Sequence, residues 1–437
     1  MLNNLNNIPK IEELRNKILF VLAMIAVYRL GTHIPVPGVN GHALAEFFRQ
    51  KLAGSAFGLY DVFVGGALSR AAIFGAGIMP YISASIIMEL LVATWPYLER
   101  LKKEGEHGQR LITRYSRYLT VIVAGIQSIG MAMFLENIKS PSGVPVVPNP
   151  GPMFMFTTVL ALVGGTLFLM WIGEQMTERG IGNGISVLIF AGTLDSIPYE
   201  FAQSVQLLKT GGTSLFAFLF VIVVVLATTV AVVAITEAQR RIPIQYAKRV
   251  VGRKVYGGQT TYLPLTLNTA GVIPIIFAQS ILMFPQTLGT FFTSDTLTYI
   301  INLFRPGTVI YDISYAALIV FFAYYYTAIV LNPKDMADNL QRYSGFIPGV
   351  RPGPQTAEYI DKIMSRILLP GAIFFAIIAI LPYHVIRMTN IHFYFGGTRI
   401  LIIVGVALEL MQQINAHLIM RQYDGLLKKG RISGWRG

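Results

Sequence analysis

The 437-residue chain contains no cysteine, and only 13% of its residues are charged. Without cysteine the chain forms no disulfide and no thiolate metal site, and it offers no cysteine nucleophile. Soluble domains normally carry about 25% charged residues, whereas 54% of the residues here are hydrophobic. The composition therefore predicts an all-α integral membrane protein that crosses the bilayer many times.

Signals for catalysis are also scarce. The six histidines have no metal-ligand spacing, and the glycine-rich turn GIGNGI at Gly180–Ile185 lacks the Lys that a phosphate-binding loop requires. Ser186 follows this turn, but no histidine or lysine lies nearby in sequence to act as its base. We therefore expect neither an enzyme nor a bound cofactor or metal. The polar first residues also argue against a cleaved secretory signal.

Apolar segments long enough to cross a bilayer core, which takes roughly 20 residues, recur along the chain. The sequence predicts ten transmembrane helices, at Ile18–Ile34, Ala71–Trp95, Thr113–Asn137, Met153–Gly173, Gly184–Leu194, Ser214–Ile235, Ala270–Leu288, Val309–Leu331, Leu368–Ile386 and Thr398–Ile419.

Lysine and arginine are unevenly divided between the loops on the two sides of these spans. With the N-terminus inside, 26 of the 35 basic residues lie inside and 8 outside, while Arg29 lies within the first span. Because cytoplasmic loops carry the excess of Lys and Arg, both termini are predicted to be cytoplasmic. Arg29 is near the outer end of its helix, which favours snorkelling or a local ion pair over an ion path.

Outer loop Asp195–Gly212 divides the chain into two halves of five spans each. We expect an N-terminal half at 1–194, a hinge loop at 195–212 and a C-terminal half at 213–437. Halves related by inverted topology are common in membrane pathways, although no sequence repeat links these two. A second outer loop, Ser140–Pro152, is rich in proline and glycine and predicts an extended crossing.

The segment Gly65–Leu91 is a broken apolar stretch with two leading glycines and Pro80 inside it. It predicts a short helix, a joint at Ser69 and Arg70, and then a longer helix. Non-helical backbone at membrane depth occurs only where protein buries it or where it lines a water-filled cavity. The segment therefore indicates either a pathway or a re-entrant loop that merely packs.

Two long cytoplasmic loops are expected to be structured. Glu237–Asn268 alternates Val, Ile and Tyr in the manner of a β-hairpin, and Asn332–Arg366 predicts a helix at Pro333–Tyr343, a turn-rich run at Pro348–Pro354 and another helix. The alternatives are anchoring to anionic lipid and docking of a large cytosolic partner, and phosphate contact with an RNA-rich partner would use clustered basic residues. The hairpin carries six of them: Arg240, Arg241, Lys248, Arg249, Arg253 and Lys254.

Five long motifs in order carry a family resemblance: GGALSRAAIFGAGIMPYISASII, EQMTERGIGNGIS, AGVIPIIFAQSI, FIPGVRPGPQTAEYIDKI and FGGTRILI. They resemble the signature stretches of the SecY family, the pore subunits of bacterial protein-conducting translocons. The resemblance covers essentially the whole chain. It implies ten transmembrane helices in two inverted five-helix halves that close like a clamshell, with a short plug helix around 59–70.

The resemblance also implies roles for particular residues. The lateral gate would include Gln127 and Asn268, and Arg351 would contact a motor or ribosome together with the six basic residues of the hairpin. The pore ring would comprise Ile78, Ile82, Ile185, Ile189, Ile276 and Ile402. The plug would include Tyr60, Val62, Phe63, Gly65, Gly66, Ser69 and Arg70.

The implied function is a channel that moves unfolded preproteins across the bacterial plasma (inner) membrane and releases signal or transmembrane segments sideways into the bilayer. The implied partners are SecE, SecG, the SecA ATPase, the ribosome, preprotein signal sequences and anionic lipid, with no DNA among them. The alternative class is a secondary transporter built from an inverted repeat. That class would need a polar or charged mid-membrane site, for which the sequence offers no clear mid-span Asp or Lys.

Overall fold

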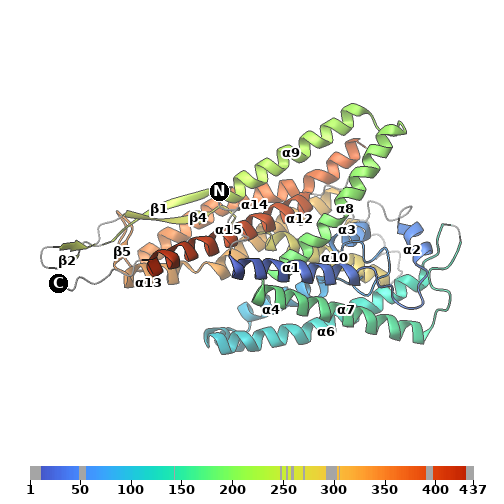
Figure 1. The fold of residues 1–437 in the computed structure, drawn as a ribbon, viewed down its shortest axis with the longest axis horizontal. Helices are drawn as coiled ribbons and strands as arrows, with labels where there is room; N and C mark the ends of the chain where they lie inside the picture. The colour runs from blue at the N-terminus through green and yellow to red at the C-terminus, as the bar shows by residue number, and fades with distance from the viewer. Residues whose placement is uncertain are drawn as a thin grey trace. The chain divides into compact units, whose positions relative to one another are not determined.

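The computed structural model of the protein describes residues 11–48, 56–141, 143–246, 249–251, 254–256, 260–268, 271–291, 303–304, 306–389 and 397–429. Figure 1 shows the chain, in which helices dominate. The helices are α1 (Glu12–Gly31), α2 (Gly41–Phe47), α3 (Ala56–Phe63), α4 (Met79–Thr94), α5 (Pro96–Lys103), α6 (Glu106–Asn137), α7 (Pro152–Arg179), α8 (Gly184–Lys209), α9 (Leu215–Glu237), α10 (Ile273–Phe291), α12 (Val309–Val330), α13 (Pro333–Arg342), α14 (Pro354–Thr389) and α15 (Gly397–Lys429). The strands are β1 (Gln239–Tyr246), β2 (Arg249–Val251), β3 (Lys254–Tyr256), β4 (Thr260–Thr266) and β5 (Gly345–Phe346).

Each of the ten predicted spans overlaps one of these helices. Within the described residues, seven helices are long and apolar enough to cross a membrane, and the number rises to eight if α4 and α5, bent by 95°, count as one span. Helix α1 lies outside this set, and the described apolar part of α10, Ile273–Met283, is shorter than a full span. The chain is thus a helical protein with several apolar spans, and the count of ten stays a prediction.

Two local predictions were wrong. Residues 195–209 were expected to form a loop, but α8 continues through them with Pro198 inside the helix. The short helix near Gly65 ends at Phe63, before the two glycines, and residues 64–78 form turns instead of the start of a span. Pro80 lies in the first turn of α4. Because the first N–H groups of a helix have no partner within it, proline is tolerated there.

The chain divides into two compact units. Unit 1 comprises Met1–Ala202, Phe284–Ile301 and Val406–Gly437, and unit 2 comprises Gln203–Met283 and Asn302–Gly405. Helices α8, α10 and α15 each contribute residues to both units. The last part of α15 therefore groups with the N-terminal spans, which the expected division at 213 did not include.

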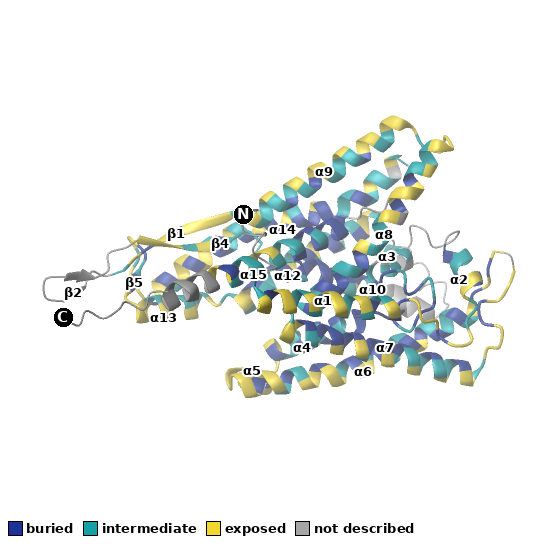
Figure 2. Ribbon diagram, viewed as in Figure 1, coloured by how far each residue is buried: buried dark blue, intermediate teal, exposed yellow. Residues whose placement is uncertain are grey.

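Unit 1 is built on the packing of α6 against α4 and α7, which lie beside it. Small residues recur every four positions on the buried face of α6, and they allow neighbouring helices to approach closely. The stripe comprises Ser116, Thr120, Ala124, Ser128 and Ala132. The opposite face of α6 is exposed in Figure 2 and carries large apolar side chains such as Ile122 and Ile126. A small-residue seam and an apolar outer face suit a helix that is surrounded by lipid.

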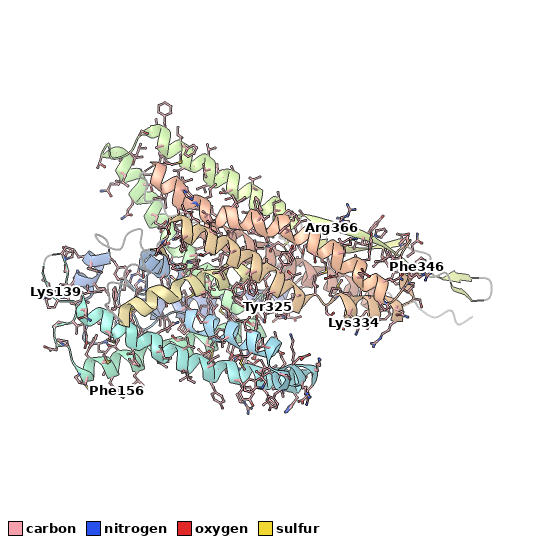
Figure 3. All side chains as sticks on the ribbon, turned by 180° about the vertical axis from the view of Figure 1, so that it is seen from behind. Lys139, Phe156, Tyr325, Lys334, Phe346 and Arg366 are labelled. Atoms are coloured by element: carbon pink, nitrogen blue, oxygen red, sulfur yellow. The ribbon has the colours of Figure 1, made fainter. Side chains whose placement is uncertain are left out.

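Unit 2 carries the predicted hairpin. Strands β1 and β4 pair antiparallel with Ile242 opposite Leu263, and β5 adds to the other edge of β1. The sheet packs on α13 and α14 around a separate apolar core formed by Ile242, Leu265, Ile347, Ile360 and Met364. Figure 3 shows Phe346, Lys334 and Arg366 toward the sheet-bearing end of this unit. The hairpin that the alternating apolar residues of 237–268 predicted thus forms one structured body with the segment 333–366.

This second core generates the first prediction. Ile360 is fully buried in it, and truncating a buried isoleucine to alanine costs about 2–5 kcal/mol through lost burial and a residual cavity. We expect Ile360→Ala to raise the rate at which protease cleaves within 239–266 several-fold. Tyr359→Ala alters an exposed neighbour on the same helix and serves as the control. Equal cleavage rates in the two variants would contradict a shared core.

Candidate functional site

The segment between α3 and α4, residues 64–78, is the most unusual part of unit 1. It contains three glycines with positive φ, at Gly65 (+64°), Gly66 (+73°) and Gly77 (+58°). L side chains avoid this region of φ, and glycine does not. These positive φ values let the chain turn repeatedly without a helix over a stretch that the sequence treats as apolar.

The backbone of this segment is paired inside the protein. Ala71 accepts a hydrogen bond from the N–H of Val36 (2.7 Å), and the N–H of Ile73 donates to the carbonyl of Ile34 (2.9 Å). The hydroxyl of Tyr60 on α3 donates to the carbonyl of Ala76. Helix α7 passes so close that a Cβ on Gly165 would lie 2.1 Å from the carbonyl oxygen of Ile73. Protein therefore encloses this non-helical backbone, as its place among apolar spans requires.

Asp61 ties α3 to the joint that follows it. Its carboxylate accepts a hydrogen bond from the backbone N–H of Ser69 (2.8 Å), and its own carbonyl accepts one from the N–H of Gly66 (2.7 Å). Burial raises the pKa of the Asp61 carboxyl, while the hydrogen bonds from Ser69 and the charge of Arg70 oppose that rise. The joint at Ser69 and Arg70 is thus fixed in this conformation by a residue that the sequence motifs did not single out.

Arg29 lies beside the same joint. Its guanidinium donates to the carbonyl of Gly65 (3.2 Å) and forms an ion pair with Asp195 on α8. The expectation that Arg29 either snorkels or pairs locally is met by this local ion pair. Asp195 was missed as its partner because the sequence predicted that a loop begins there, whereas α8 continues and holds the carboxylate in place.

Four of the six isoleucines assigned to a pore ring belong to unit 1, at the first turns of two helices. Ile78 and Ile82 are buried at the start of α4, and Ile189 is buried and Ile185 half-buried at the start of α8. Asn183 caps α8, because its side-chain oxygen accepts from the N–H of Ile185 (3.0 Å). The GIGNGI turn therefore begins a helix, which is the role that the sequence assigned to it.

The other two isoleucines belong to unit 2. Ile276 on α10 is 9% exposed, and Ile402 on α15 is fully buried. The two helices approach closely, since a Cβ on Gly405 would lie 2.3 Å from a methyl group of Val272. All six positions therefore carry β-branched apolar side chains without a polar atom, five of them on helices and Ile78 at the N-cap of α4.

Gln127 and Asn268, the residues assigned to a lateral gate, lie in different units. Gln127 is half-buried on α6 of unit 1. Asn268 of unit 2 is half-buried just after β4, and with Gly271 and Pro274 it lines a small cavity closed by Phe375 of α14. Each amide thus interrupts an otherwise apolar surface of its own unit.

The basic residues of the hairpin are only partly within the described residues. Arg240 and Arg241 are exposed on β1, and the backbones of Arg249 and Lys254 lie in β2 and β3. Lys248 and Arg253 lie outside the described residues. Exposed guanidinium groups on a rigid strand suit contact with carboxylates or phosphates.

Arg351 is exposed on the loop between β5 and α14. Gly349 and Gly353 flank it with φ of +82° and +102°, and the carbonyl of Arg351 accepts from the Thr356 hydroxyl (2.9 Å). Pro354 begins α14, where a proline is tolerated because the first N–H groups of a helix have no partner within it. The loop backbone is thereby fixed, while the guanidinium remains free to meet solvent or a partner.

Within the part of the chain that the structure describes, no cluster of three or more His, Asp or Glu side chains could hold a metal ion. Some of the charged pairs found there lie within one helix, and others join neighbouring helices. Arg117 on α6 pairs with Glu174 on α7 (2.9 Å), and His384 on α14 contacts Asp312 on α12 (3.0 Å).

Comparison with known sequences gives close relatives over almost the full length. A family model described as SecY matches residues 72–411. The chain is 47% identical over 421 residues to the protein translocase subunit SecY of Aquifex aeolicus (strain VF5), covering 96% of this chain and 98% of that protein. It is 46% identical over 427 residues to the protein translocase subunit SecY of Escherichia coli (strain K12), covering 97% of this chain and 96% of that protein.

Comparison with solved structures gives the same fold at low sequence identity. A protein-conducting channel aligns with a TM-score of 0.66 at 17% identity, covering 97% of this chain and 95% of that one. A second channel aligns with a TM-score of 0.65 at 17% identity, covering 97% of this chain and 95% of that one. Its plug domain is described as stabilising the closed state and maintaining a membrane seal. Sec61 in the canine ribosome-channel complex from the endoplasmic reticulum aligns with a TM-score of 0.60 at 15% identity, covering 97% of this chain and 95% of that one.

Proposed function

The chain belongs to the SecY family of protein translocase subunits, and we propose that it forms the pore through which unfolded preproteins cross the membrane. In this proposal, signal and transmembrane segments leave the pore sideways into the bilayer. The membrane is the bacterial plasma (inner) membrane, with both termini in the cytoplasm. The excess of basic residues in the predicted cytoplasmic loops supports this orientation.

The observation that carries the proposal is the folded, non-helical segment at residues 64–78. Its turns are paired with Ile34 and Val36 and enclosed by α7, and it connects the short helix α3 to the isoleucines at the start of α4. A plain helical bundle needs no such segment. A movable plug does, because it must be stable within the protein and still detach from the helix that follows it. The seal attributed to the plug of the second channel above supports this role.

A ring of the six isoleucines would close the pore around a polypeptide of any sequence. Isoleucine offers no hydrogen bond to water or ions, so a narrow isoleucine constriction closes by dewetting. Its branched side chain is stiff at χ1, which suits a gasket more than a specific binding site. Five of the six side chains are buried, which is compatible with a narrow, dry constriction.

Two halves hinged at the turn after α8, residues 210–214, would open along a lateral gate containing Gln127 and Asn268. A signal sequence is itself an apolar helix, so the pore needs a side exit that opens without large cost. Interhelical hydrogen bonds in membranes contribute only about 0.6 kcal/mol each. Polar residues at a gate would therefore hold the seam weakly enough for an incoming apolar helix to displace them.

The cytoplasmic sheet and the Arg351 loop would form the docking surface for the motor and the ribosome. Their common core, shared by β1, β4 and α14, gives a partner a surface of fixed shape. The ribosome complex of Sec61 supports the ribosome as one partner. SecA, SecE, SecG, preprotein signal sequences and anionic lipid complete the proposed set.

The pore ring gives the second prediction. Ile276→Asn places an amide in the dry constriction and stabilises wetted, open states, so secretion of a reporter with a weakened signal sequence should rise several-fold. Ile281→Asn alters an exposed isoleucine on the same helix and should leave secretion unchanged. No gain from Ile276→Asn at normal expression would remove Ile276 from the ring.

The plug gives the third prediction. Deleting residues Leu59–Ser69 removes the joint but none of the long helices. In planar bilayers the purified channel should then conduct ions at rest several-fold more than wild type, while ATP-dependent translocation stays largely intact. A resting conductance equal to that of wild type would show that this segment does not seal the pore.

The Arg351 loop gives the fourth prediction. If the residue only attracts lipid, which depends on charge at about 1 kcal/mol per basic residue, Arg351→Lys should be silent. If it docks SecA, lysine loses the planar fork of donors and Arg351→Glu adds repulsion. We expect both variants to fold, with Glu abolishing SecA-driven transport into vesicles and Lys reducing it measurably.

The matched control is Arg342→Glu, which reverses an exposed charge at the end of α13, outside the 348–354 loop segment. It should retain most of the transport activity. Normal ATP-dependent transport by Arg351→Glu would exclude Arg351 from the docking surface, whatever the control does.

A further inference from the structure

Three segments of unit 1 meet at the carbonyl of Gly65. Arg29 of α1 and Arg70 of the joint both donate to this oxygen, at 3.2 and 3.3 Å. The guanidinium of Arg29 also pairs with Asp195 of α8. One side chain therefore links α1, the joint after α3 and the middle of α8.

Two glycines bring the joint and α8 into backbone contact at the same place. A Cβ on Gly65 would lie 3.3 Å from the Cα of Gly192, and a Cβ on Gly192 would lie 2.7 Å from the carbonyl oxygen of Phe63. The hydroxyl of Tyr28 lies within 3.0 Å of both Cβ positions. Any side chain at residue 192 would push the joint away from α8.

We propose that Arg29, Asp195 and the Gly65–Gly192 contact form a latch that holds the plug segment against α8 and sets how readily it leaves. This inference rests on the proposed plug function and assigns the residues that control it. Arg29 and Asp195 act here as positioning residues, because they hold the joint and do not contact the transported chain.

The geometry gives each part a separate task. The planar guanidinium of arginine presents several donors in a fixed fork, so Arg29 binds a carboxylate and a carbonyl together. Asp195 fixes the direction of that fork. If the joint leaves, the Gly65 carbonyl loses the charged donor Arg29, while Arg70 moves with the joint and Arg29 keeps Asp195. Both side chains are partly exposed, at 33% and 25%, and such pairs contribute modestly, which suits a latch that must open.

The latch also lies close to the proposed ring along α8. Ile189, Gly192 and Asp195 follow one another at intervals of three residues, so they are neighbours along one side of the helix. A displacement of α8 at the ring would therefore reach the contacts that hold the joint. Release of the plug and widening of the ring are coupled in this arrangement through a single helix.

The test compares resting ion conductance of Arg29→Gln, Asp195→Asn and the double variant with wild type and with the Leu59–Ser69 deletion. Each single variant should conduct several-fold more than wild type and no more than the deletion. Because the two residues act as one pair, the double variant should not exceed the larger single effect. Arg117→Gln and Glu174→Gln remove the α6–α7 pair, which does not touch the joint, and should conduct like wild type.

A second comparison avoids any change of charge. Gly192→Ala should raise resting conductance, since its methyl group would displace Phe63 or Tyr28. Gly164→Ala in α7, where a Cβ meets nothing within 4 Å, should not. The absence of native cysteine also permits Ser69→Cys as a single label site, and a membrane-impermeant maleimide should label it faster in the Asp195→Asn and Gly192→Ala backgrounds.

The possible outcomes distinguish a failure of the latch proposal from a failure of the plug proposal. If the deletion conducts and the latch variants do not, with labelling of Ser69→Cys unchanged, the latch is refuted and the plug stands. If neither the deletion nor the latch variants conduct, the plug proposal itself fails. Additive effects of Arg29→Gln and Asp195→Asn would refute the pair as the working element.

Discussion

Backbone polar groups at membrane depth must find partners inside the protein, because the bilayer core offers none. Most of this chain meets that constraint with helices. Residues 64–78 meet it differently, through hydrogen bonds within their own turns, such as Ala72 N–H to the Ala67 carbonyl (2.8 Å), and through bonds to other parts of the chain, namely Ile34, Val36 and the carboxylate of Asp61. A segment stabilised by contacts with other elements can be released when those contacts break, whereas a helix carries its own hydrogen bonds. The constraint therefore distinguishes residues 64–78 from the described helices of unit 1, in line with the plug role proposed for them.

Close approach of backbones is the means by which unit 1 encloses this segment. Gly165 lets α7 pass against the carbonyl of Ile73, and Gly192 lets α8 contact the joint. The small-residue stripe of α6 does the same for the neighbouring helices. In lipid there is no hydrophobic force between apolar helices, so such close packing carries the association. Glycine thus has two roles here, allowing positive φ within the segment and leaving room for it in the surrounding helices.

The sequence predicted the existence of helices and strands well and their ends poorly. Apolar windows located a helix for every predicted span, and the alternation in 237–268 located β1 and β4. The same windows ended α8 fifteen residues early, because residues 195–209 are too polar for a span and yet remain helical. The ion pair between Arg29 and Asp195 joins residues 166 positions apart in sequence. Composition and periodicity describe only neighbouring residues, so they could not predict this pair. The roles of the isoleucines came from family resemblance, since isoleucine is ordinary in any span.

Unit 2 links its β-sheet to its apolar helices through α14. This helix begins at Pro354, directly after the Arg351 loop, and its 36 residues extend roughly 54 Å at about 1.5 Å per residue. Pro370 lies within it, where a proline removes one helical hydrogen bond and favours a bend. Next to it, a Cβ on Gly371 would lie 2.9 Å from the carbonyl of Leu267, the residue before Asn268. A force applied by a partner at Arg351 would therefore reach the segment that carries Asn268 within one folded body, which is what a docking surface must do if it is to control a gate.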